Sequence, residues 1–400
     1  MLGKKKNKYK NQNGWSYKAP ILGVMCAALL GGGVYIGKHI SKQDVDKQEK
    51  TIDKEYTHEN LKHILRKGIT YESEGVFLDD ILKFMEEEKE PFEPAKKKDK
   101  IDYSAIKGLD CGLQEKVKKT LEEDILSEKW ITKRYEKMFT RLSKFDDMFV
   151  DSRNYALLVQ ELGPSLLNNN RLQKSRTGAS GYGQLMPGSK IENGLISNGI
   201  IDESYHPIKG IKAAMQHHKR YNFENILPKL NEKISLDLAV YNFGYGNVMN
   251  GIAKIIEEKG KDPEEIFRYS NHNTVLGIKN AEKLDNLDID YEKFSKKIPL
   301  ETRNYIERVN ALTVFMDNVK QGNLEGVKIK KQPLFSELFE ERRLGEGNYL
   351  YKVWEDEVKD KGVSWDIYNN MVNMHIVDNT KLTPDTKILV PSKKMPVDYF

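Results

Sequence analysis

The sequence contains little cysteine: Cys26 and Cys111 are the two in 400 residues, and they lie far apart without metal-ligand neighbours. This argues against a disulfide scaffold and a structural zinc site, and we expect no metal or other cofactor. Acidic residues are missing from positions 1–43, which hold eight lysines. The net charge of +5 belongs to this tail, because the other 357 residues carry 57 basic and 60 acidic side chains, a net of −3. A basic nucleic-acid-binding surface is therefore not expected.

Charged residues are also missing from residues 19–37, which follow a tail, residues 1–18, that contains six lysines. A helix of that length would span about 28 Å, close to the thickness of the hydrocarbon core of a bilayer. The lysines before it predict a cytoplasmic tail and an extracytoplasmic body. We therefore expect a single-pass protein of the cell membrane. A cleaved signal segment and a secreted protein are the alternative, because small residues follow at Ala27, Ala28 and Gly31–Gly33.

No alternating strand pattern appears before about residue 335, and no long internal repeat is present. Apolar residues recur at helical spacing from Leu113 onward, which predicts a mainly α domain over residues 113–325. Residues 38–112 before it form a charged spacer, and residues 337–393 after it form a small module of mixed character. Helices of the main domain are expected over residues 151–163, 207–222, 234–242, 248–259 and 300–320.

One carboxylate lies on an apolar helix. Asp151 and Ser152 can cap this helix at its start, and Gly163-Pro164 ends it just after Glu161. Apolar neighbours and the negative end of the helix dipole both favour the protonated form of Glu161. A general acid at neutral pH needs that form, so Glu161 is a candidate catalytic residue. The alternative is an ordinary glutamate at a frayed helix end.

Acidic residues are missing again from Leu162 to Ile191, a stretch of 30 residues rich in Gly, Ser, Asn and Gln. At the average of the chain, 60 acids in 400 residues, four or five would be expected there. Such a segment suits a groove lined by backbone and hydrogen-bonding groups, with one isolated carboxylate at its edge. It does not suit the pair of catalytic acids found in most glycosidases.

Five segments, in this order, resemble the motifs of lytic transglycosylases of the soluble-lytic-transglycosylase family. VDSRNYALLVQE at 150–161 is similar to the helix that carries the catalytic glutamate of that family, and SRTGASGYGQLMP at 175–187 to its glycine-rich loop. The other three are HPIKGIKAA at 206–214, YNFGYG at 241–246 and ETRNYI at 301–306. The chain departs from the family in a longer stretch between Gly246 and Glu301.

The resemblance implies a lysozyme-like α-helical domain that cuts the β-1,4 bond between N-acetylmuramic acid and N-acetylglucosamine in peptidoglycan. Glu161 would protonate the glycosidic oxygen, then accept the proton of the muramyl 6-hydroxyl as a 1,6-anhydro ring closes. Peptidoglycan strands are the implied partner, and one carboxylate serves in both roles. The implied substrate-binding residues are Ser175, Gly181, Tyr182, Gln184, Met186, Tyr241, Asn242 and Tyr305. Ser175 is expected to hydrogen-bond near the glutamate.

The end of the chain resembles a LysM module, in which two short strands flank two helices (βααβ). Residues 347–353, GNYLYKV, are similar to its opening, and residues 362–368 and 386–391 to its middle and end. The resemblance implies binding to glycan chains rich in N-acetylglucosamine, which would hold the catalytic domain on its polymer. Asn348-Tyr349 replaces the usual Asp-Thr, so a module that keeps only the fold is the alternative.

Two other functions stay open at this point. One is a lysozyme-like hydrolase of the same bond, in which Asp151 or Asp202 positions a water beside Glu161. The other is a catalytically silent protein that binds the cell wall. The adjacent His217-His218 lacks a carboxylate at ligand spacing and is interpreted as solvated surface.

Overall fold

The computed structural model describes residues 101–392, apart from residues 128, 150, 163–173, 176, 221–222 and 271–273. The predicted tail 1–18, the predicted membrane segment 19–37 and the spacer up to residue 100 lie outside the described residues. In the part of the chain that the structure describes, no helix is both long enough and apolar enough to cross a membrane.

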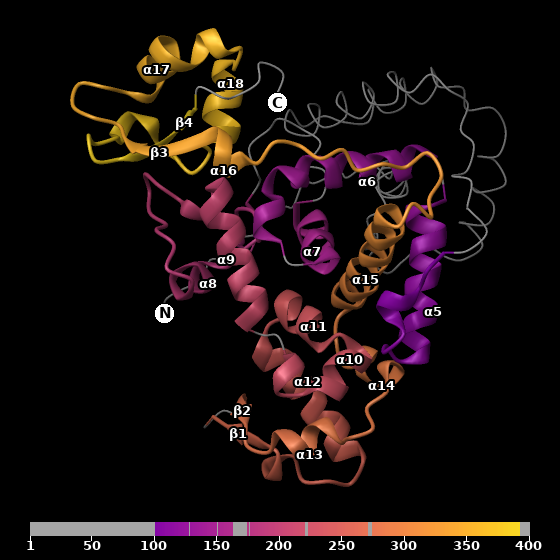
Figure 1. Ribbon diagram of the computed structural model, residues 1–400. Helices are drawn as coiled ribbons and strands as arrows, with labels where there is room; N and C mark the ends of the chain where they lie inside the picture. The colour runs from indigo at the N-terminus through magenta and orange to yellow at the C-terminus, as the bar shows by residue number, and fades with distance from the viewer. Residues whose placement is uncertain are drawn as a thin grey trace, which may run out of the picture. The chain divides into compact units, whose positions relative to one another are not determined.

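The described residues are mostly helical, which confirms the prediction of a mainly α chain (Figure 1). The helices are α5 (Cys111–Thr120), α6 (Lys129–Leu142), α7 (Ser152–Leu162), α8 (Pro187–Glu192), α9 (Pro207–Arg220), α10 (Pro228–Ile234), α11 (Leu236–Phe243), α12 (Tyr245–Glu258), α13 (Ala281–Asp285), α14 (Tyr291–Ser295), α15 (Leu300–Lys320), α16 (Phe335–Leu338), α17 (Leu350–Val353) and α18 (Trp365–Ile367). All five helices that the sequence predicts for the main domain are present, with ends shifted by a few residues.

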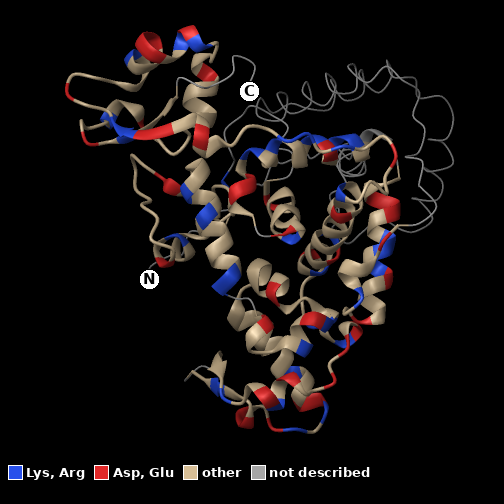
Figure 2. Ribbon diagram, viewed as in Figure 1, with Lys and Arg blue, Asp and Glu red and all other residues tan. Residues whose placement is uncertain are grey.

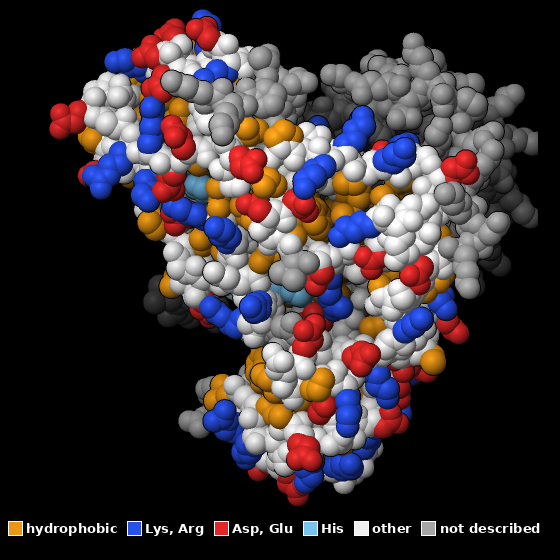
Figure 3. Space-filling view, in the orientation of Figure 1, with side chains coloured by type: hydrophobic (Ala, Val, Ile, Leu, Met, Phe, Trp, Pro, Cys, Tyr) orange, Lys and Arg blue, Asp and Glu red, His pale blue; other side chains and the backbone are white. Residues whose placement is uncertain are grey.

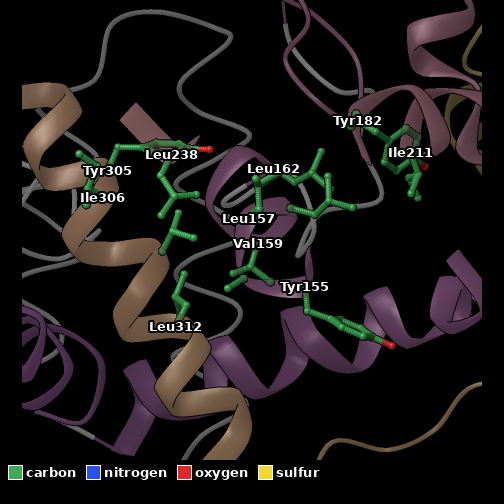
Figure 4. Close-up of a cluster of buried hydrophobic side chains, with 14 of the residues drawn as sticks. Tyr155, Leu157, Val159, Leu162, Tyr182, Ile211, Leu238, Tyr305, Ile306 and Leu312 are labelled. Atoms are coloured by element: carbon green, nitrogen blue, oxygen red, sulfur yellow. The ribbon is translucent and has the colours of Figure 1, made fainter. Parts of the chain in front are cut away.

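The long helix α15 organises the core. It packs against α5, α7 and α11, and eleven of its 21 residues are buried. Its buried polar side chains are satisfied within the core: the Asn310 side-chain amide donates to Ser235 Oγ (3.0 Å) and to the carbonyl of Ile306 (2.8 Å). Figure 4 shows apolar side chains of α7 and α15 meeting in one cluster, among them Leu157, Val159 and Leu312.

Two short strands, β1 (Phe267–Tyr269) and β2 (Val275–Ile278), pair antiparallel in the stretch between α12 and α13. The sequence predicts no strand before about residue 335, so that prediction is wrong here. Segments of three and four residues are too short to display an alternating pattern, and Gly277 interrupts β2. The hairpin lies between Gly246 and Glu301, in the stretch that is longer than in the family whose motifs the chain resembles.

The packed part of the chain begins before residue 113, where the sequence places the boundary of the spacer. Ile106 and Leu109 are buried against the helical core. Asp102 is held at both of its peptide groups: its N–H donates to Asn318 Oδ1, and its carbonyl accepts from Asn318 Nδ2, both at 2.8 Å. Residues 101–112 therefore belong structurally to the helical core.

The C-terminal segment contains β3 (Phe339–Arg343) and β4 (Lys387–Pro391), which pair antiparallel in full register with α17 and α18 between them in the chain. It contacts the segment before α9, because Val377 N–H donates to the carbonyl of Ile200 and Asp202 N–H to that of His375, both at 2.8 Å. Lys209 Nζ lies 2.6 Å from Glu203 Oε1 and 2.9 Å from Glu341 Oε2. Backbone and ionic contacts thus join this segment to the helical core.

Charged side chains of both signs are distributed over the helices and strands of the described residues (Figure 2). The surface is indented between α8 and α9 on one side and α12 with the β1–β2 hairpin on the other (Figure 3). No single sign of charge dominates the visible face, in keeping with the near-neutral composition that the sequence has after residue 43.

Candidate active site

Glu161 lies in the last turn of α7. Asp151 caps the start of this helix, because its Oδ1 accepts the N–H of Asn154 at 2.9 Å, as the sequence predicts. The middle of the helix, from Tyr155 to Val159, is buried against the core. α7 is described to Leu162, so the carboxylate stands where the helix meets the polar segment that follows.

The Glu161 carboxyl is bonded to one tyrosine, whose ring stacks on a second tyrosine from another helix. Tyr305 of α15 donates a hydrogen bond from Oη to Glu161 Oε1 (2.5 Å). The ring of Tyr241, on α11, is nearly parallel to that of Tyr305, with centroids 6.5 Å apart and an angle of 14°. Burial raises the pKa of Glu161 from its ordinary value of 4.5 to about 7, and the hydrogen bond from Tyr305 opposes this shift. The carboxyl is therefore held near the midpoint of its titration at neutral pH.

A tight glycine loop, residues 180–185, reaches the same site. Ser180 and Leu185 form an antiparallel bridge that closes the loop, and Tyr182 N–H donates to the carbonyl of Ser204 (3.0 Å). Tyr241 Oη donates to the carbonyl of Gly183 (2.8 Å), which joins the loop to α11. The glycine loop, Tyr241 and Tyr305 thus form one chain of contacts that ends at Glu161.

A buried ion pair supports the loop from behind. Lys190 Nζ lies 2.7 Å from Asp202 Oδ2, and Ser204 Oγ donates to Asp202 Oδ1 at 2.6 Å. Burial alone would raise the pKa of Asp202, but the bonds from Lys190 and Ser204 together lower it. Asp202 is therefore an ionised structural carboxylate that anchors Ser204 beneath Gly181.

The other predicted binding residues have contacts of their own. The Ser175 hydroxyl accepts the N–H of Ala179 (2.8 Å) and lies 3.0 Å from the Thr177 hydroxyl, so its described bonds stay within its loop and not with Glu161. Asn242 Oδ1 accepts from Thr302 Oγ1 at 2.8 Å.

The remaining three predicted residues of the loop differ in exposure. The Tyr182 ring is buried and meets Phe145 edge-on, with centroids 6.0 Å apart. Gln184 adopts a positive φ of 45° and donates from Nε2 to the carbonyl of Gly181 (3.1 Å). Met186 is 44% exposed. Tyr182 therefore contributes to the core and Met186 to the surface beside the loop.

The interpretation of His217-His218 as solvated surface is wrong. Both side chains are buried, and His218 Nε2 lies 3.2 Å from Asp237 Oδ2. Arg153 Nη2 of α7 donates to both oxygens of Asp237, at 2.7 and 2.9 Å. The signal in the sequence was Asp237 itself, a charged residue within the apolar run that forms α11.

No group of three His, Cys, Asp or Glu side chains among the described residues is arranged to hold a metal ion. No protein-family model matches the chain, and no curated protein is significantly similar to it in sequence. The function is therefore argued from the geometry of the site.

The raised pKa of Glu161 predicts a pH-dependent effect on stability. In the unfolded chain Glu161 ionises near pH 4.5, whereas in the folded chain it keeps its proton to about pH 7. The stabilisation from the neutral carboxyl is complete below pH 4.5 and is lost as the pH rises through 7; it amounts to about 3 kcal/mol. Relative to the wild type, Glu161→Gln should thus gain about 3 kcal/mol of unfolding free energy between pH 4.5 and pH 8. Denaturant unfolding of both proteins at the two pH values measures this, and an equal difference at both would contradict the raised pKa.

Proposed function

We propose that the protein is a peptidoglycan lytic transglycosylase with a lysozyme-like catalytic domain, as the resemblance of its five motifs implies. One observation carries the proposal: the single carboxyl of Glu161, with its pKa near 7, is bonded to Tyr305, which stacks on Tyr241, and Tyr241 in turn is bonded to the glycine loop. Each of these groups comes from a segment that resembles a motif of that family.

The chemistry needs a carboxyl that can both give and take a proton at neutral pH. Glu161 protonates the oxygen of the β-1,4 bond between N-acetylmuramic acid and N-acetylglucosamine as the bond to C1 breaks. The resulting carboxylate takes the proton of the muramyl 6-hydroxyl, whose oxygen closes on C1 to give the 1,6-anhydro ring. The proton count balances without water, and a pKa near 7 suits both half-steps.

Hydrolysis of the same bond would need a group to activate water, and the two candidates for that role are occupied. Asp151 caps the N-terminal end of α7, about 15 Å from Glu161 along the same helix. Asp202 is paired with Lys190 and Ser204. Among the described residues, the groups that act on the pKa of Glu161 include no second carboxylate. This arrangement favours the non-hydrolytic reaction.

The C-terminal segment is proposed to be a LysM-like module that holds glycan strands. The order β3, α17, α18, β4 and the antiparallel pairing of the two strands support this, and Tyr349, at the opening of the segment, is 55% exposed. The lysine-rich tail and uncharged residues 19–37 support a membrane anchor with the catalytic domain outside the cell. Together these proposals describe a membrane-anchored enzyme of the cell wall.

Digestion of purified peptidoglycan by the full-length protein tests the proposal, with the products weighed by mass spectrometry. We expect muropeptides with 1,6-anhydro ends. Ends heavier by one water would instead identify a hydrolase. Absence of any released product, with retained binding to the polymer, would identify a silent wall-binding protein.

A further inference from the structure

A buried charged cluster lies beside Tyr241, the tyrosine that stacks on Tyr305. Asp237, in the first turn of α11, is 3% exposed, and Arg153 of α7 and His218 of α9 both contact its carboxylate. Burial alone would raise the pKa of Asp237, but Arg153 and His218 together lower it, so the group is ionised. Three helices thus meet at one buried carboxylate.

Buried ion pairs are a weak source of stability, because desolvation offsets most of the attraction between the charges. Apolar residues of similar volume would serve a purely packing role as well. The arrangement of this cluster therefore calls for another explanation, and its contacts lead toward the candidate active site.

A series of contacts between aromatic rings leads from this cluster to Glu161. The His218 ring meets the Tyr241 ring edge-on, with centroids 5.9 Å apart, and the His217 ring does the same at 5.4 Å. Tyr241 is also fixed at its hydroxyl, which donates to the carbonyl of Gly183. Tyr305 stacks on Tyr241 and donates its hydroxyl hydrogen to Glu161.

We propose that Asp237 and His218 are positioning residues for Glu161. Asp237, held by Arg153, fixes the His218 ring. The His218 ring holds Tyr241 in place, and Tyr241 in turn holds Tyr305 in hydrogen-bonding position at the Glu161 carboxyl. The role of Glu161 in catalysis rests on the proposed function, but the positioning itself does not. The charged and titratable groups that face this path among the described residues are Glu192 from α8, Arg153 from α7, His217, His218 and Arg220 from α9, Asp237 and Tyr241 from α11, and Tyr305 from α15.

The proposal has a consequence that simple loss of stability does not share. The hydrogen bond from Tyr305 favours the ionised form of Glu161. If His218 no longer supports Tyr241, the hydrogen bond weakens and Glu161 should titrate at higher pH. A variant that only destabilises the fold leaves that titration where it is.

The test measures the titration of Glu161 inside the full-length protein without using activity. The difference in unfolding free energy between each protein and its own Glu161→Gln derivative is followed from pH 4.5 to 9. This difference changes above the unfolded-state pKa of Glu161 and reaches a plateau at its folded-state pKa, so the pH at which the plateau begins reports the pKa of Glu161 in the folded protein. In the His218→Leu background we expect the plateau to begin about half a pH unit or more higher. His218→Gln, which keeps an N–H donor for Asp237 but lacks the ring beside Tyr241, serves if His218→Leu does not fold, and the same rise is expected.

Asn318→Ala is the matched control. Asn318 is buried in the same helix as Tyr305, but about 20 Å along it, and its amide holds Asp102. This variant should lose stability with no change in the pH at which the plateau begins. An unchanged onset of the plateau in a folded His218 variant, or an equal rise in Asn318→Ala, overturns the positioning role.

Activity gives a second readout if the wild type releases anhydro products. His218→Leu should then lower kcat by about tenfold or more with little change in KM, because the reacting group is misplaced while the groove stays intact. If the wild type releases no product, the proposed function fails, whereas the titration still decides whether His218 positions Glu161.

Discussion

Glu161→Gln is expected to release no anhydro-ended muropeptides from peptidoglycan, with kcat reduced by about 10³-fold or more. Glutamine keeps the size of the side chain and can still accept the hydrogen bond from Tyr305, but it can neither donate a proton to the glycosidic oxygen nor accept one from the 6-hydroxyl. Both half-steps depend on this group, so the loss should exceed that of an ordinary acid–base residue. Mass spectrometry of digests measures the change.

Binding should survive in the same variant, because the glycine loop, Tyr241 and the C-terminal segment are unaltered. Co-sedimentation with insoluble peptidoglycan measures this. Glu325→Gln, which replaces an exposed glutamate, should behave like the wild type in both assays. Full release by Glu161→Gln would remove Glu161 from the mechanism, and with it the proposed reaction.

Gly181→Ala is expected to cost about 3 kcal/mol or more of unfolding free energy, and to lower activity with it. Gly181 has a φ of +79°, in the left-handed region that an alanine adopts only with strain. A Cβ at this position would also lie 2.1 Å from the carbonyl oxygen of Ser204, which is buried and accepts the N–H of Tyr182. The neighbouring backbone cannot yield without breaking the contact that shapes the loop.

Gly194→Ala separates the cost of the left-handed backbone from the cost of the close contact with Ser204. Gly194 has a similar φ of +71°, but a Cβ there would meet no atom within 4 Å. Its expected cost is about 1 kcal/mol, from backbone conformation alone. Thermal or denaturant unfolding of both variants gives the comparison. Equal costs at the two positions would show that the close approach to Ser204 is not what requires glycine at 181.

The parts of the fold that the sequence predicted well are those with a pattern local to one element. Helix α7 has an apolar stripe, a capping Asp151 and a glycine–proline stop, and each of these signals is local to the helix. The burial that raises the pKa of Glu161 followed from its apolar neighbours on that stripe. The association of Glu161 with Tyr305, 144 residues away, rested on the family resemblance and not on any physical pattern.

The failures have a shared cause, because each depends on a partner that is distant in the sequence. His218 was interpreted as solvated since its partner, Asp237, lies on another helix. Asp102 was assigned to the spacer, whereas Asn318 holds it against the core. Side-chain satisfaction of this kind cannot be read from spacing alone.

The attachment of Asp102 to Asn318 bears on mechanical load. A force pulling on the chain before residue 101 would act first on these two hydrogen bonds between Asp102 and the Asn318 side chain. Asn318 lies in the C-terminal half of α15. Tyr305 stands about 20 Å further along the same helix, where the rod is clamped between α7 and α11. Tension from a tether would thus reach α15 first in its C-terminal half, at a distance from the hydrogen bond between Tyr305 and Glu161.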